Sequence, residues 1–76
     1  MTWMRPFAEP ITLKDGRTIA TLGEARAVMQ SLPERRQYSE RWLYAGALLR
    51  EAATAGGALY NATEQLTRAL KAEGLI

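Results

Sequence analysis

Residues 38–55 read YSERWLYAGALLREAATA, the longest stretch of the chain that is both apolar and periodic like a helix. Apolar side chains recur there at steps of four and three, so a helix would place them on one side. The side chains of this face are Tyr38, Trp42, Ala45, Leu48, Leu49 and Ala52. Such a broad apolar face predicts a helix over 38–55 that covers the core of the protein.

Two glycines follow this stretch and predict where it ends. Gly56 and Gly57 stop the helix, and a second apolar stripe runs over 58–73, where Gly74 takes the C-cap position. A link this short favours two antiparallel helices. Small side chains at the facing positions would let the two backbones approach closely. These are Ala45, Ala52, Ala62 and Ala69.

The segment before residue 38 carries the signals of a shorter helix. Thr21 and Glu24 fit a capping box, in which the Thr21 hydroxyl accepts from the Glu24 amide and the Glu24 carboxylate accepts from the Thr21 amide. Pro33 disfavours a helical conformation at the residue before it. The sequence therefore predicts a capped helix over 22–32, followed by a polar connector over 34–37.

Alternating apolar residues predict a β-hairpin over 10–21. A two-residue turn would place Ile19 on the opposite face from Ile11 and Leu13. A three-residue loop over 14–16, with its glycine at positive φ in a bulge, instead pairs Ile11 with Ile19 and gathers all three on one face. We therefore predict the bulged loop, and we expect its apolar face to lie on a helix because an isolated hairpin is marginally stable.

Residues 1–9 show no period, but they include Trp3, Met4 and Phe7, whose exposure to water is costly. We expect this lead-in segment to lie across the core. Together the elements predict an α+β fold with one domain over 1–76, in which the N-terminal β-hairpin packs on three helices and the last two form an antiparallel pair.

Length and composition limit both the fold and the chemistry. A chain of 76 residues has room for one domain, and 47% hydrophobic residues is close to the globular average. It has no cysteine and no histidine, which excludes disulfides and removes the usual zinc ligands and the usual acid–base catalyst near neutral pH. With neither a signal-peptide pattern nor an apolar run of membrane-spanning length, we expect a cytoplasmic location.

No group of residues points to catalysis, to a cofactor or to a metal ion. Glu40 and Glu51 lie about 16 Å apart along a helix, well beyond the separation of paired catalytic carboxylates. Asp15 is the only aspartate, so it cannot form a calcium loop alone. Gly56 and Gly57 are not followed by the lysine of a phosphate-binding loop. We therefore expect no enzyme activity, no catalytic, cofactor-binding or metal-binding residues, and no cofactor.

Motifs along most of the chain resemble one small bacterial family. They comprise the hairpin residues Phe7, Glu9, Pro10, Ile11 and Leu13, the capped helix with Ala25, the break at Leu32 and Pro33, then Tyr38 and the alanine-rich helix pair. Together they resemble the bacterial domain of unknown function 982 family. The resemblance implies a small domain and carries no catalytic residue over to this chain.

The stretch 35–42 is the strongest functional candidate, because three arginines surround two aromatic residues there. Such interleaving is typical of single-stranded nucleic-acid binding by charge and stacking. The opposing interpretation places Tyr38 and Trp42 in the core and pairs Arg36 with Glu40 one helical turn later. The formal net charge of only +2 favours this second interpretation.

These considerations predict a small non-enzymatic protein-interaction or regulatory module, with self-association as one of its forms. Its partner would be another protein or a second copy of the chain, reached through unpaired strand edges or apolar helix residues outside the stripe. The candidate interaction surface consists of Arg35, Arg36, Arg41 and Tyr44. Weak nucleic-acid binding through 35–42 is the alternative, and no membrane contact is expected.

Overall fold

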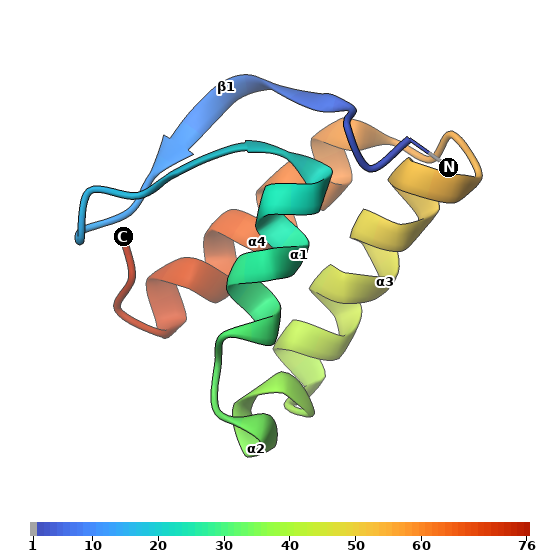
Figure 1. Cartoon of the computed structure of the whole chain (residues 1–76). Helices are drawn as coiled ribbons and strands as arrows, with labels where there is room; N and C mark the ends of the chain where they lie inside the picture. Colours follow the sequence, from blue (N-terminus) through green and yellow to red (C-terminus); the bar gives the residue numbers. More distant parts are fainter. Residues whose placement is uncertain (1) are drawn as a thin grey trace.

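An N-terminal β-hairpin lies over a group of helices, and the last two helices pack against each other (Figure 1). This computed structural model describes residues 2–76 and confirms the expected α+β fold. In chain order the elements are β1 (Pro6–Thr12), β2 (Thr18–Thr21), α1 (Leu22–Gln30), α2 (Glu34–Gln37), α3 (Glu40–Thr54) and α4 (Leu59–Ala72).

Trp42 on α3 is the largest fully buried side chain of the core. Beside it, α3 and α4 run in opposite directions, as the short glycine link predicts (Figure 1). All four alanines expected between these helices are fully buried. Because an alanine side chain is a single methyl group, the two backbones can approach closely along this contact.

Tyr38 lies outside this core, so its place in the predicted stripe is wrong. Its side chain is 67% exposed because the chain does not form one helix over 38–55. The expected connector forms the helical turn Glu34–Gln37, Ser39 has an extended backbone with φ −65° and ψ 149°, and α3 begins only after it. This break changes the helical phase, which leaves Tyr38 on the surface.

The hairpin has the bulged loop that the sequence predicts. Ile11 pairs with Ile19, and Gly16 has a φ of +95°. The Leu13 amide donates to the Arg17 carbonyl at 2.8 Å and closes the loop. Leu13 and Ile19 are buried and Ile11 is half-buried, so the apolar residues share the face that packs on the helices.

Asp15 organises the tip of this loop. Its carboxylate accepts hydrogen bonds from the Arg17 amide at 2.9 Å and from Arg17 Nε at 2.7 Å. The backbone hydrogen bond, followed by the guanidinium, holds the pKa of the Asp15 carboxyl below its ordinary value. Both side chains are about half exposed, so this pair orders the turn more than it stabilises the fold.

The expected lead-in segment over 1–9 is partly a strand, since β1 already begins at Pro6 and its pairing is irregular between Pro6 and Ile11. Phe7 is buried and Trp3 packs against the core, as expected. Met4 is 83% exposed, contrary to the expectation, because a turn closed by the Arg5 amide precedes the strand there. Met1 lies outside the described residues.

The segment between Thr2 and Arg5 closes the C-terminal end of α3. The Thr2 amide and hydroxyl both donate to the Ala53 carbonyl, at 2.7 and 2.9 Å. Arg5 Nη1 donates to the carbonyls of Ala52 at 3.2 Å and Gly57 at 3.1 Å. The last carbonyls of a helix lack partners within it and carry partial negative charge, so an arginine is well suited to this position.

The first helix, α1, begins at Leu22 as predicted, but one bond of its capping box differs. The Thr21 hydroxyl accepts from the Glu24 amide at 3.2 Å. The Glu24 carboxylate accepts from the Ala20 amide at 3.0 Å, rather than from the Thr21 amide. The helix ends at Gln30, two residues before the predicted end, because the chain already turns there toward α2.

Glu73 connects three helices at one end of the core. Its Oε1 accepts from Trp42 Nε1 at 3.1 Å, and its Oε2 accepts from Arg36 Nη1 at 2.8 Å. The expected ion pair between Arg36 and Glu40 is therefore wrong, because α2 turns the guanidinium toward the end of α4. Glu73 is itself the C-cap residue of α4.

A glycine turn after α4 links the end of the helix to the hairpin loop. Gly74, one position beyond the C-cap, has a φ of +74°. The Leu75 amide donates to the Leu70 carbonyl at 2.9 Å, which is the pairing of a Schellman motif. The Leu75 carbonyl in turn accepts from the Lys14 amide at 2.8 Å.

Trp42→Ala should lower the free energy of unfolding by about 3–5 kcal/mol, because it removes the largest buried side chain. Trp42→Phe should cost less than Trp42→Ala because an aromatic ring stays in the core, although the hydrogen bond to Glu73 is lost. Chemical denaturation followed by circular dichroism measures both. Tyr38→Ala is the matched control and should change stability by less than about 0.5 kcal/mol. A similar loss for Tyr38→Ala would contradict these assignments.

Arg5→Met should lower the free energy of unfolding by about 1–2 kcal/mol, because the Ala52 carbonyl at the end of α3 and the Gly57 carbonyl in the following link lose a charged donor. Arg17→Met removes an equal charge from a surface pair and should have a smaller effect. Thermal melts of the two variants make the comparison. Equal stabilities would show that Arg5 does not cap α3.

Candidate interaction surface

The strand edges of the hairpin are poor sites for adding a strand from a partner. Since Ile11 and Ile19 direct their hydrogen-bonding groups toward each other, the residue before Ile11 and the residue after Ile19 direct their groups outward. On β1 this residue is Pro10, which has no N–H. On β2 it is Ala20, whose amide already donates to the Glu24 carboxylate. Thr12 and Thr18, on the other side of this pair, still direct their amides outward, so each edge keeps an outward donor near the loop. The reduced number of donors along the edges directs attention to the helices.

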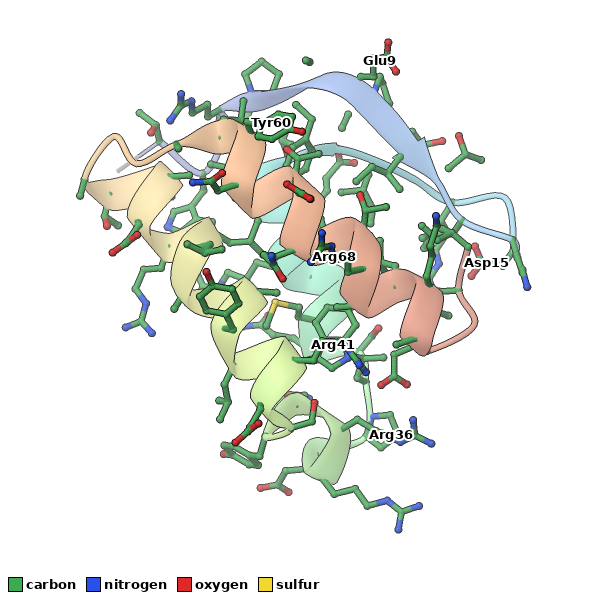
Figure 2. The ribbon with its side chains drawn as sticks, turned by 180° about the vertical axis from the view of Figure 1, so that it is seen from behind. Glu9, Asp15, Arg36, Arg41, Tyr60 and Arg68 are labelled. Atoms are coloured by element: carbon green, nitrogen blue, oxygen red, sulfur yellow. The ribbon has the colours of Figure 1, made fainter. Side chains whose placement is uncertain are left out.

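Large apolar side chains are exposed mainly on the helical part of the molecule. Leu43 and Tyr44 on α3 are 53% and 56% exposed, and Tyr60 on α4 is 76% exposed. Figure 2 shows Tyr60 beside the hairpin, well away from Arg36 and α2. Exposed apolar side chains close together on a small protein are typical of contact surfaces.

Two of the four predicted surface residues come together. Arg41 and Tyr44 line an open depression between α3 and α4, and Arg68 of α4 lines it as well. Figure 2 shows Arg41 and Arg68 on the same side of the molecule. Acidic groups balance the charge there, because Glu40 lines the same depression and Glu64 pairs with Arg68 at 2.9 Å.

The other two predicted residues lie apart from this depression. Arg36 is held by Glu73 at 2.8 Å, and Figure 2 shows it near α2. Arg35 is exposed on α2. The four predicted residues therefore do not form one continuous site around Arg41 and Tyr44.

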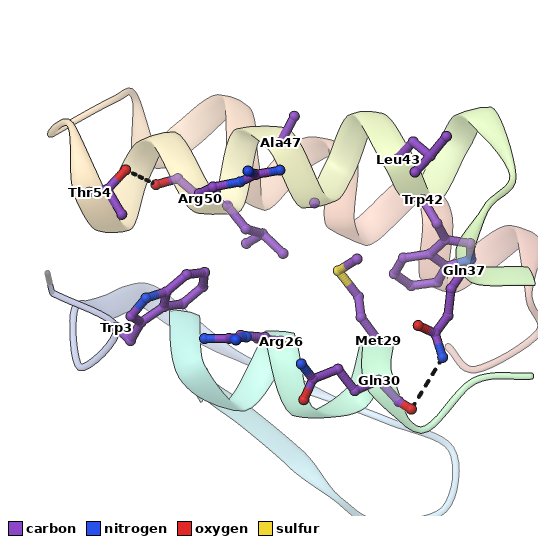
Figure 3. Close-up of a pocket in the computed structure, with 12 residues that line it drawn as sticks. Trp3, Arg26, Met29, Gln30, Gln37, Trp42, Leu43, Ala47, Arg50 and Thr54 are labelled. Atoms are coloured by element: carbon purple, nitrogen blue, oxygen red, sulfur yellow. Dashed lines mark hydrogen bonds between the residues drawn. The ribbon is translucent and has the colours of Figure 1, made fainter. Parts of the chain in front are cut away.

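A groove between α1 and α3 is the better-formed site, with a volume of about 500 Å³ (Figure 3). We call it the α1–α3 groove. Trp3 borders one end, and Met29 extends from α1 toward α3 in its middle (Figure 3). Gln37 closes the other end, where its amide donates to the carbonyls of Leu32 at 2.7 Å and Gln30 at 3.3 Å.

Two arginines flank the α1–α3 groove, one on each helix. Arg26 of α1 lies over the Trp3 ring, with its guanidinium carbon 4.9 Å from the ring centroid. Arg50 of α3 stands on the opposite wall (Figure 3). None of the residues lining the groove is acidic. The groove therefore combines apolar and uncharged polar side chains with a positive charge on each side.

Two glycines leave space for side chains and backbone that shape the α1–α3 groove. The Gly23 amide donates to the Trp3 carbonyl at 2.7 Å, and a Cβ atom at Gly23 would lie 3.2 Å from that oxygen. A Cβ atom at Gly46 would lie 2.9 Å from the Met29 methyl group. Trp3 can therefore approach the start of α1, and Met29 can lie against the backbone of α3.

Sequence reasoning missed the residues of this groove. The sequence predicts only that Trp3 covers the core, and Arg26 and Arg50 belong to no motif of the sequence. Each helix taken alone gives no sign that the two arginines face the same space. The contrast between a basic pair here and balanced charge around Arg41 could be found only once the helices were packed.

The described residues contain no cluster suited to metal binding. Over residues 2–76, no three histidine, cysteine, aspartate or glutamate side chains gather closely enough to hold an ion. In the same part of the chain, no helix has the length and apolar character needed to cross a membrane.

Comparisons with known proteins leave the site to be interpreted from its geometry. No protein-family model matches the chain, and neither a curated protein nor a solved structure is detectably similar to it. Membership of the domain of unknown function 982 family is therefore a proposal that rests on the sequence motifs alone.

Proposed function

We propose that the protein is a non-enzymatic protein-interaction module that contacts its partner through α1 and α3. The observation that carries this proposal is the α1–α3 groove, in which exposed Leu43, half-buried Trp3 and Met29, and two arginines surround about 500 Å³ of open space. Apolar contact area with a charged border is the usual composition of a protein interface. Self-association is one form of this function, with a second copy as the partner.

Weak nucleic-acid binding through 35–42 is the second candidate, favoured by one feature. Tyr38 is 67% exposed and lies close in sequence to Arg35, so its ring is accessible for stacking. Two features of the same stretch weigh against it. Trp42 is fully buried, and the Arg36 guanidinium is engaged by Glu73.

A photo-crosslinking residue, p-benzoylphenylalanine, in place of Leu43 should form adducts with protein in a lysate of the organism that encodes the chain. Leu43 is exposed at the groove, whereas Glu9 is exposed on the hairpin and serves as the matched control position. Gel electrophoresis and mass spectrometry identify the adducts, and a product of twice the chain mass indicates a second copy. Adducts at neither position, or equally at both, would contradict the proposal.

The purified protein should show no salt-sensitive binding to single-stranded or duplex oligonucleotides of mixed sequence at about 50 mM salt, because Trp42 is buried and Arg36 is paired with Glu73. Fluorescence anisotropy of labelled oligonucleotides measures this. Binding that weakens steeply with salt, and that is lost in Arg35→Ala with Tyr38→Ala, would establish the nucleic-acid alternative instead.

A further inference from the structure

We propose that the α1–α3 groove receives an acidic amphipathic helix of a partner protein. This inference rests on the proposed function and names the chemistry of the partner. The groove has an apolar floor, two positively charged walls and no acidic lining residue, and each of these features constrains what can bind there.

The dimensions of the groove suit about three turns of a helix. Along α3 it extends from Trp42 to Thr54, which corresponds to about 18 Å at the rise of an α-helix. Ala47 lies between these ends, is exposed and has only a methyl side chain, so a partner backbone can come close to α3 at this position. Met29 in the floor is flexible and can adapt to apolar side chains of different shape. An open groove of this kind receives the apolar face of a helix at successive turns.

The two walls determine the charge of the partner. The Arg26 guanidinium lies over the Trp3 ring, which restrains the side chain, and its N–H groups can bind a carboxylate. Arg50 stands across the groove on α3 (Figure 3). A helix with a central apolar stripe and carboxylates on both sides of it would meet one arginine on each wall. A basic helix would meet like charge on both.

A second copy of this chain fits these requirements less well. Its exposed helix surfaces carry arginines at Arg41 and Arg50 on α3, and on α4 the carboxylate of Glu64 is already paired with Arg68. None of these surfaces is an apolar stripe with acid on both sides. A foreign acidic helix is therefore the occupant that the charges favour.

Selection from a displayed library of 14-residue peptides tests the inference. Leucine is fixed at the first, fourth, fifth and eighth positions of a helical repeat, and the other positions are random. Peptides selected on the wild-type protein should be enriched in glutamate and aspartate beside the leucine stripe. No selection above background, or selected peptides without acidic enrichment, would overturn the inference.

Charge-reversed variants locate the binding site. The most enriched peptide, made synthetically, should bind Arg26→Glu with Arg50→Glu about tenfold or more weakly than the wild-type protein by calorimetry. Arg35→Glu with Arg41→Glu carries the same change in net charge on another part of the surface and should bind within about threefold of wild type. Equal losses in the two pairs would place the effect in overall charge and overturn the site.

Two further measurements keep the outcomes separable. Circular dichroism checks that each variant is folded, and Arg26→Gln with Arg50→Gln replaces the reversed pair if that pair is unfolded. Protein adducts at Leu43 together with peptides lacking acidic enrichment would leave the interaction module standing and remove the acidic helix. Failure of both experiments would remove both proposals.

Discussion

The fold depends on burying the Trp42 indole with its N–H satisfied. An indole offers the core a large apolar area, but its nitrogen must keep a hydrogen-bond partner when water is excluded. Glu73 provides that partner from the end of α4, and Arg36 on α2 keeps the carboxylate from standing without a counter-charge. No buried side-chain nitrogen or oxygen of the described residues lacks a partner. One carboxylate therefore positions α2, α3 and α4 relative to one another.

Hydrogen bonds at the ends of the helices supply stability that the alanine-rich packing does not provide. The small side chains between α3 and α4 allow close approach, but each buries little area. The chain compensates by giving helix ends partners from distant segments, as when Thr2 and Arg5 take the last carbonyls of α3. The same segment places Trp3 at the α1–α3 groove, so the hydrogen bonds that stabilise the end of α3 also shape the proposed interaction site.

Local rules predicted much of the fold and little of the site. The register of Ile11 with Ile19 and the start of α1 follow from alternation, loop length and capping, which involve residues close in sequence. Tyr38 was misplaced because one extended residue at Ser39 changes the helical phase, and periodicity alone does not detect such a break. The groove was missed because Arg26 and Arg50 face each other only through tertiary packing.

Hydrogen bonds between segments far apart in the sequence also determine when the chain can complete its fold. The hydrogen bonds from Thr2 to Ala53 and from Lys14 to Leu75 each close a long loop. Closing such a loop lowers the entropy of the chain before the stabilising contacts have formed. During translation, at about 5–20 residues per second, the hairpin emerges well before the elements it rests on. Trp3 gains its place beside the groove only after α3 has left the ribosome. A nascent chain consequently cannot complete the α1–α3 groove before α3 has been synthesised.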